Sequence, residues 1–261
     1  MFSNPFAALS ASVSPAIMQT YVVVMALLVV AGTLFDIIHK QSATYFFNNW
    51  RDFRSRAKRQ VSGGRMASLV VQTAVVDVMA SGEFCNMRRR MAHLLTMYGF
   101  VIYVVTTIMM VFAYPTAAVP TPGSVAALWY IGSLMVCAGG YWFWFFIRVD
   151  VVAEGNTPFR FVRADLFIVA LVVSVTFGLL WAVLQTTGNT GWSYAFLGLY
   201  LLATTVLFGS IPWSKFSHMF FKPAAALEKR VAEANGTMSN LPPPADAPRR
   251  YGGGLEHARH Y

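Results

Sequence analysis

The charged residues of this chain occur in blocks, and the long stretches between the blocks decide what the chain can fold into. No Asp, Glu, Lys or Arg occurs in residues 1–35, 91–147 or 166–214 of the 261-residue sequence. An α-helix needs about 20 predominantly apolar residues to cross a bilayer, whereas a helix on a soluble protein carries charges on its outer face. The charge-free stretches are long enough to span and have no charged face. The sequence therefore predicts an integral membrane protein.

Prolines, glycines and short polar turns divide the charge-free stretches into separate spans. The predicted spans are residues 16–38, 92–113, 124–147, 166–184 and 193–217. The fold class that follows is an all-α integral membrane protein, a bundle of five transmembrane helices. A short uncharged lead, residues 1–15, precedes the first span.

The positions of lysine and arginine predict the orientation of the spans. Residues 39–91, residues 148–165 and the region after residue 215 hold essentially all of these cations, whereas the turns at 114–123 and 185–192 hold none. Loops on the cytoplasmic side are enriched in Lys and Arg. The N-terminus is therefore expected in the periplasm and the C-terminus in the cytoplasm. The formal net charge of +9 reflects this orientation, and we expect no nucleic-acid partner.

The basic segment at residues 39–91 is long enough to form structure of its own. Aromatic residues and cations alternate between positions 45 and 59, a pattern typical of a helix that lies in the interface on anionic lipid or against a partner subunit. Gly63-Gly64 is expected to end that helix. The stretch Ala67–Met79 is apolar but too short to span, so it is predicted to be interfacial or re-entrant.

The C-terminal region differs in composition from the spans. Residues 218–261 are predicted to be a cytoplasmic tail, with a short helix at Ala224–Ala234 followed by a sequence rich in Pro and Gly. Such a tail is expected to be largely disordered unless a partner binds it. Cys85 and Cys137 form no CxxC motif, and they indicate neither a disulfide framework nor a cluster site.

Two histidines are candidate metal ligands at the cytoplasmic side. His93 lies about one turn inside the second span and His218 directly follows the fifth. Because these spans run in opposite directions, both imidazoles can reach one depth and bind the iron of a b-type haem from two sides. Arg89, Arg90 and Lys215 lie where the haem propionates would emerge. The alternative is that the histidines simply lie among lipid headgroups; we favour ligation because they form a pair flanked by cations.

A second polar pair, Asp36 and His39, ends the first span. The two residues are three positions apart and are expected to share a helix face. A carboxylate and an imidazole at the membrane edge can exchange protons with a quinone, whose redox reactions move protons together with electrons. The preferred interpretation is simpler, namely that Asp36, His39 and Lys40 form a helix end facing the cytoplasm.

Two stretches around the histidines resemble a known group of membrane proteins. The run from Ser81 to Phe100, which contains the arginines and His93, and the run from Pro212 to Pro223 resemble the cytochrome-b-type membrane subunits related to nitrate reductase gamma and heterodisulfide reductase. Within that group, residues 81–100 are most similar to the membrane anchor associated with dissimilatory adenylylsulfate (APS) reductase of sulfur-oxidising bacteria. The resemblance covers most of the chain up to about Pro223.

The resemblance implies a ligand set and a location. His93 and His218 match the axial pair of the haem nearer the cytoplasmic partner, in a bacterial inner membrane. The ligands of the second, far-side haem would fall where this sequence has Tyr103 and Tyr200. We therefore expect no far-side haem, and at most one b haem in all.

These observations lead to two expected functions. The first is a membrane anchor that docks a cytoplasmic iron–sulfur/flavin oxidoreductase, APS reductase alpha/beta by resemblance, and passes electrons between that enzyme and membrane quinone during sulfite oxidation. The alternative is a haem-free anchor that only recruits the soluble enzyme. A small transporter is a third possibility that has little support, because the sequence shows no internal repeat and no mid-membrane charge.

Overall fold

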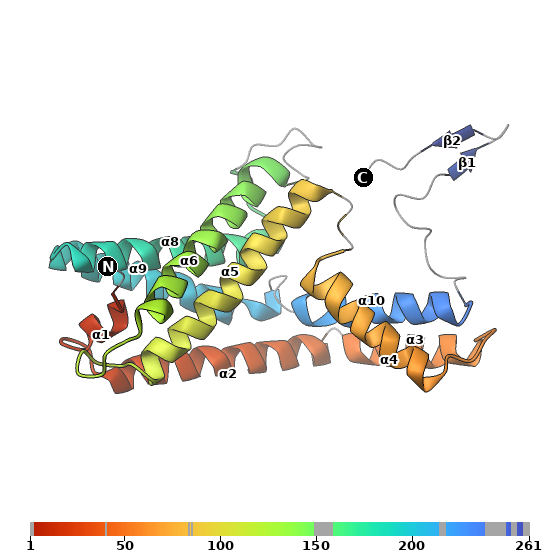
Figure 1. Cartoon of the computed structure of the whole chain (residues 1–261), viewed down its shortest axis with the longest axis horizontal. Helices are drawn as coiled ribbons and strands as arrows, with labels where there is room; N and C mark the ends of the chain where they lie inside the picture. Colours follow the sequence, from red (N-terminus) through yellow and green to blue (C-terminus); the bar gives the residue numbers. More distant parts are fainter. Residues whose placement is uncertain are drawn as a thin grey trace. The chain divides into compact units, whose positions relative to one another are not determined.

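A computed structural model describes residues 3–39, 41–82, 84, 86–148, 159–213, 218–237, 249–251 and 255–257. The chain divides into two compact units, one of residues 1–41 with 88–219 and one of residues 42–87 with 220–261. We call them the membrane unit and the second unit. Five helices of the membrane unit are long and apolar enough to cross a bilayer (Figure 1). They are α2 (Pro15–His39), α5 (Met87–Phe112), α6 with η2 (Gly123–Ile147), α8 (Leu166–Thr186) and α9 (Thr190–Gly209). The predicted all-α, five-span class is confirmed, and the chain is a multi-pass membrane protein.

Two spans differ from their predicted bounds for reasons that are visible in the sequence. The helix α5 begins at Met87 rather than at residue 92, because the three arginines that follow are good helix formers. The fifth span was predicted to reach residue 217, but α9 ends at Gly209 and is followed by the short 3-10 helix η4 (Ile211–Trp213). Pro212 accounts for this early end, since proline has no N–H to donate and excludes its predecessor from the α conformation.

The spanning helices make a closed set of neighbours. Side-chain hydrogen bonds join α8 to α9 through Ser174 and Thr204 at 2.7 Å, and α2 to α9 through the Tyr21 hydroxyl, which donates to the Leu201 carbonyl at 2.9 Å. The helix α6 packs against α8, and the Gln19 amide on α2 donates to a carbonyl near the end of α5. The helices α5 and α6 are also neighbours, as described next, so the spans follow one another around the unit in the order α2, α9, α8, α6, α5 and back to α2.

Glycines allow α5 and α6 to lie side by side at very short range (Figure 1). A Cβ atom added to Gly99 of α5 would lie 2.8 Å from backbone atoms of α6, and one added to Gly132 of α6 would lie 2.9 Å from backbone atoms of α5. Gly139, two turns further along α6, is equally close to the backbone of α5. Small residues that bring two backbones together are a common means of helix association in lipid.

The residues predicted to be a lead contain a short helix, α1 (Pro5–Leu9), which packs into the membrane unit. Phe6 and Leu9 are 4% and 2% exposed, and Phe6 belongs to the main hydrophobic core. Asn4 caps the helix with its side chain and also bonds to the loop between α5 and α6. The lead is therefore part of the packed interior of the membrane unit. It lies at the end where the uncharged loop joins α5 to α6.

The described residues of the second unit form three helical segments and a short hairpin. They are α3 (Ser42–Ser55), α4 (Gly63–Gln72) with the π-helix η1 (Thr73–Met79), α10 (His218–Ala234, of which all but the first two residues belong to this unit), and the paired strands β1 (Arg249–Tyr251) and β2 (Leu255–His257). Gly63-Gly64 was expected to end a helix, but this is wrong: α3 already ends at Ser55, and the glycine pair begins α4, whose N-cap is Ser62. Glycine at the first turn is tolerated because the Ser62 hydroxyl accepts an otherwise unpaired N–H there.

Two sets of hydrogen bonds between described residues join separate segments of the second unit. The Arg230 guanidinium on α10 binds both carboxylate oxygens of Asp77 on η1, at 2.5 and 2.8 Å. The Asn235 carbonyl after α10 accepts the backbone N–H groups of Lys58 and Arg59 at 3.0 and 3.1 Å. The helix that follows the last span is therefore packed against the segment between the first two spans, and it is longer than the short helix expected at 224–234.

Candidate functional site

Five of the predicted site residues, Asp36, His39, Arg89, Arg90 and His93, lie at the charged end of the membrane unit, which we define as the end formed by residues 36–39, 87–93, 144–148 and 211–213. Several contacts between described residues join the helix ends there. The Arg89 guanidinium on α5 donates to the Ile147 carbonyl at the end of η2, at 3.1 Å. Gly32 of α2 lies against Ile211 and Pro212 of η4, where an added Cβ atom would be 3.0 Å from the Ile211 Cβ. A further contact is an ion pair between Arg148, directly after η2, and Asp165, directly before α8.

That ion pair belongs to a buried cluster around Arg148, the first residue of the cation-rich region 148–165 that was used to predict the orientation of the spans. Arg148 is 3% exposed; its guanidinium binds the Asp165 carboxylate at 2.6 Å and the Arg160 carbonyl at 2.5 Å. The same guanidinium lies 4.2 Å above the Trp144 ring, which stacks on Phe161. A buried cation needs such a set of partners. The signal in the sequence was the opposite charges flanking one loop between adjacent spans.

His93 lies on the side of α5 that is not packed against α6. Its neighbour Ala92 is 1% exposed and faces Gly139 of α6, whereas the His93 side chain is exposed. Arg89 and Arg90 are half-buried one turn earlier on the same helix. The three residues thus lie on adjacent turns at the start of α5, and a contact between the imidazole and the guanidinium groups stays a prediction.

The second predicted ligand is described only in part. His218 is the first residue of α10, but its side chain is not among those that the structure describes. Lys215 lies outside the described residues. The separation of the two imidazoles therefore stays a prediction, as does the proximity of Lys215 to a propionate.

Asp36 and His39 have different environments, although they are three residues apart. Asp36 is 2% exposed and faces the interior of the charged end, one turn beyond Gly32. His39 is exposed, and its ring stacks on Phe35 with the centroids 5.4 Å apart and the planes 10° from parallel. The pair does not form one polar surface. A planar ligand could instead stack on the exposed rings of Phe35 and His39. The Asp36 carboxylate lies on the same helix, less than one turn from His39.

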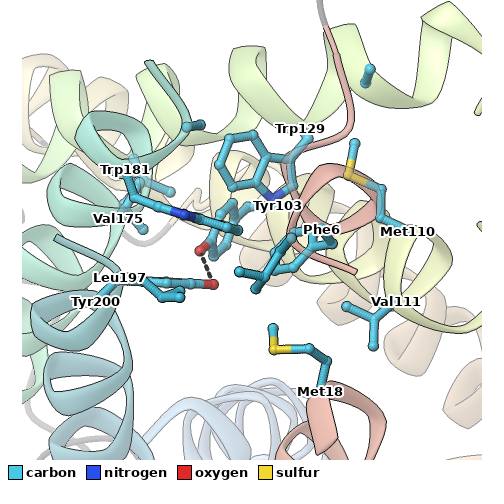
Figure 2. Close-up of a cluster of buried hydrophobic side chains, with 14 of the residues drawn as sticks. Phe6, Met18, Tyr103, Met110, Val111, Trp129, Val175, Trp181, Leu197 and Tyr200 are labelled. Carbon is cyan, nitrogen blue, oxygen red and sulfur yellow. Dashed lines mark hydrogen bonds between the residues drawn. The ribbon is translucent and has the colours of Figure 1, made fainter. Parts of the chain in front are cut away.

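The opposite half of the membrane unit contains the two tyrosines that occupy the far-side ligand positions. The Tyr103 hydroxyl on α5 donates to the Tyr200 hydroxyl on α9 at 2.7 Å (Figure 2). Trp181 stacks on Tyr200 with a centroid distance of 5.9 Å, Trp129 lies 5.5 Å from Tyr103, and the Phe6 ring contacts both tryptophans. All five side chains are buried.

This packing bears on whether a porphyrin fits between α5 and α9 in that half. The two hydroxyls are in direct contact, and a Cβ added to Gly178 would lie 3.3 Å from the Tyr200 ring. Phenol groups bonded to one another leave no place for a metal between them, so the residues here do not fit a haem. At the charged end, the exposed imidazole of His93 beside Arg89 and Arg90 has the donor chemistry of an axial ligand and its anion partners.

No protein-family model, curated protein or solved structure matches this chain. Among the residues that the structure describes, no three His, Cys, Asp or Glu side chains gather to form a metal centre. A haem needs only two axial donors from the protein, so this finding concerns multi-ligand centres such as zinc sites.

The arrangement allows different chemistry at the two ends. The charged end presents an imidazole with guanidinium groups on α5, and a stacked imidazole with a nearby buried carboxylate on α2. The other end is closed by α1 and an aromatic core in which the polar atoms of Tyr103 and Tyr200 bond to each other. Groups that can bind anions or exchange protons with a ligand are thus concentrated at one end.

Proposed function

We propose that this chain is a membrane anchor that docks a cytoplasmic iron–sulfur/flavin oxidoreductase and passes electrons between it and membrane quinone through at most one b haem. The membrane is the bacterial cytoplasmic membrane, with the charged end and the second unit on the cytoplasmic side. The resemblance of residues 81–100 and 212–223 makes APS reductase the proposed partner. The observation that carries the proposal is the confinement of candidate ligand-binding groups to the charged end.

The proposed haem site uses residues of α5 and the start of α10. His93 and His218 are the proposed axial ligands, and Arg89, Arg90 and Lys215 are the proposed partners of the propionates. When bound, the haem would supply a one-electron carrier between the docked enzyme and the quinone. The chain's own contribution is to hold the imidazole of His93 on the open side of α5, and to fix the Arg89 guanidinium through its bond to the Ile147 carbonyl.

The proposed quinone contact is at the end of α2. The stacked rings of Phe35 and His39 present a flat apolar face of the kind on which a quinone ring can lie. His39 is exposed and can exchange protons with the cytoplasm, while the buried carboxylate of Asp36 lies within one turn. Substitution of His39 by alanine is expected to leave haem content unchanged and to slow quinone reduction; an unchanged rate would remove this role.

The alternative function is a haem-free anchor that only recruits the enzyme. One observation favours it: the Arg230–Asp77 pair and the Asn235 carbonyl join separate segments of the second unit to one another, and a docking platform of this kind would need no cofactor. Such an anchor would still co-purify with APS reductase alpha/beta, and the partner would then reduce quinone with its own cofactor at the membrane face.

One experiment separates the two functions. The purified protein is examined by a dithionite-reduced minus oxidised visible spectrum, with haem quantified per chain, for the unaltered chain and for His93→Ala. The electron carrier is expected to bind one b haem that His93→Ala abolishes without preventing membrane insertion. The variant His39→Ala is the matched control, because it removes an exposed imidazole at the same end. Absence of haem from a well-folded sample identifies the haem-free anchor, and normal haem in His93→Ala refutes the axial assignment.

A further inference from the structure

The helix formed by α4 and η1 has one face that neither the second unit nor the proposed function uses. We propose that this face lies in the acyl-chain boundary of the adjacent leaflet, so that the helix is a membrane-surface anchor in addition to the five spans. The proposed occupant is lipid. The anchor is independent of the haem and quinone assignments.

The opposite face of this helix is buried, and α10 of the second unit binds it through an ion pair. Leu69 and Thr73 are 3% and 4% exposed. One turn further on, Asp77 is bound in a bidentate ion pair by Arg230 of α10, and the two side chains are only 10% and 20% exposed. The only charge of the helix after Arg65 is thereby neutralised on the packed side.

The outward face carries valines with no charge among them. Val71 and Val75, four residues apart, are 62% and 51% exposed, and they are flanked by Val70 and Val76 at 45% and 39%. Residues four apart project from the same side of a helix. Ser68 and Gln72 are also exposed on this helix, but no charged residue lies among the valines, whereas a soluble surface helix carries charges on its outer face. Four exposed valines on one side and a neutralised carboxylate on the other make this an amphipathic helix of the kind that lies in an interface.

Chain connectivity favours lipid over a protein as the occupant. Only seven residues, 80–86, separate the end of η1 from Met87, where the spanning helix α5 begins. Eight residue steps reach at most about 28 Å when fully extended, so a bilayer surface is always within reach of this helix. A segment tethered so closely meets the lipid at a high effective concentration.

Charge favours the same occupant. Residues 41–90 contain nine Lys and Arg against three Asp and Glu. Such a basic segment beside a span is attracted to anionic lipid headgroups, and the valines are then free to enter below those headgroups. The cations and the valines therefore act together on one leaflet, while the exposed parts of α3 and α10 are left to a protein partner.

The test places an environment-sensitive fluorophore on the outward face of the full-length protein in lipid nanodiscs. Val71→Cys and Val75→Cys are labelled with a nitrobenzoxadiazole maleimide in a Cys85→Ser, Cys137→Ala background whose folding is checked by circular dichroism. The matched control is Glu233→Cys, an exposed position on α10 of the same unit. Nanodiscs contain phosphatidylglycerol and phosphatidylcholine, with or without doxyl-labelled lipid.

The proposal predicts blue-shifted emission at positions 71 and 75 and at least a twofold loss of intensity with doxyl lipid, with neither effect at position 233. Emission at 71 and 75 that matches position 233 overturns it. Shielding that arises only when the oxidoreductase is added identifies a protein occupant and also overturns it. Self-quenching between labelled chains, lost on dilution with unlabelled chain, identifies a second copy instead. A second readout is Val71→Cys modification by a membrane-impermeant reagent, which should be slow in nanodiscs and at least tenfold faster in detergent of short chain length.

Discussion

One side chain, that of Asn4, both caps the helix α1 and bonds it to the loop between α5 and α6, so replacing Asn4 with alanine tests how firmly the helix is held. The Asn4 carbonyl oxygen accepts the N–H groups of Phe6 and Ala7 at 2.9 and 3.1 Å. Its amide nitrogen donates to the Tyr114 carbonyl and the Thr121 hydroxyl at 3.0 and 2.9 Å. Asn4 is itself only 8% exposed. The substitution thus removes a helix cap and two bonds to the loop between α5 and α6 at once.

The expected cost follows from these bonds. Loss of an N-cap side chain costs about 1 kcal/mol, and each buried hydrogen bond lost to the loop costs about 1 kcal/mol more. The docking of α1 should therefore weaken by about 3 kcal/mol, which corresponds to a local opening equilibrium on the order of 100-fold larger. The remaining anchors are the buried side chains of Phe6 and Leu9, so α1 should stay bound most of the time.

Hydrogen–deuterium exchange of the protein in detergent or nanodiscs measures this opening. The informative amides are those of Ser10 and Val13, which donate to the Phe6 and Leu9 carbonyls and do not touch Asn4. Asn189→Ala is the matched control, since Asn189 also stands at a helix N-cap but makes no side-chain capping bond. Exchange at Ser10 and Val13 should accelerate on the order of 100-fold in Asn4→Ala and stay unchanged in Asn189→Ala. An acceleration below about fivefold would refute the docking role of Asn4.

Three further substitutions test other contacts. Gly139→Ala places a methyl group within 2.6 Å of the α5 backbone and should lower the free energy of unfolding, followed by thermal denaturation of the purified protein, by about 1–3 kcal/mol. The methyl group of Gly198→Ala meets open space, so this control should leave the free energy of unfolding unchanged. Equal effects of the two substitutions would contradict close α5–α6 packing. Arg230→Met removes the partner of the Asp77 carboxylate, whose side chain is only 10% exposed. The free energy of opening measured by exchange of η1 and α10 amides should therefore fall by about 2–4 kcal/mol. Unchanged protection would contradict the role of the pair. Burial raises the pKa of Glu228 above its ordinary value of 4.5, so the second unit should lose stability as pH rises from 4.5 through that raised pKa. Protection of its amides from hydrogen exchange should fall over the same pH range, and Glu228→Gln should flatten this fall. An unaltered slope in Glu228→Gln would exclude Glu228 as its source.

Charge-free runs and turn residues were enough to predict the five spans, because the bilayer imposes a length and an absence of charge that a single sequence shows directly. Two helix ends differed from the prediction, and in both cases a local preference of the backbone, rather than the extent of the charge-free stretch, decides where the helix begins or ends. Pro212 ends α9 eight residues early, and the arginines after Met87 extend α5 toward its charged end. Both effects are local and could have been read from the sequence.

Contacts between distant segments could not be predicted in the same way. The docking of Phe6 between two tryptophans, the Arg148–Asp165 pair and the Arg230–Asp77 pair join residues from 17 to more than 150 positions apart. Each residue type has many possible partners along the chain, and nothing in one sequence chooses among them. The environments of Asp36 and His39 were unpredictable for a related reason, since the residues that pack against a helix decide which of two neighbouring side chains is covered.

The direct bond between Tyr103 and Tyr200 has a consequence for the energetics of the proposed function. A protein that carries electrons across a bilayer needs redox groups in both halves, and here the half away from the charged end is filled by bonded phenols and stacked rings. Under the proposed function, electrons therefore enter and leave on the cytoplasmic side, and the quinone exchanges its protons there through groups such as His39. Electron transfer of that kind moves no charge across the membrane potential, so its driving force is set by the difference in reduction potential between the docked enzyme and the quinone alone.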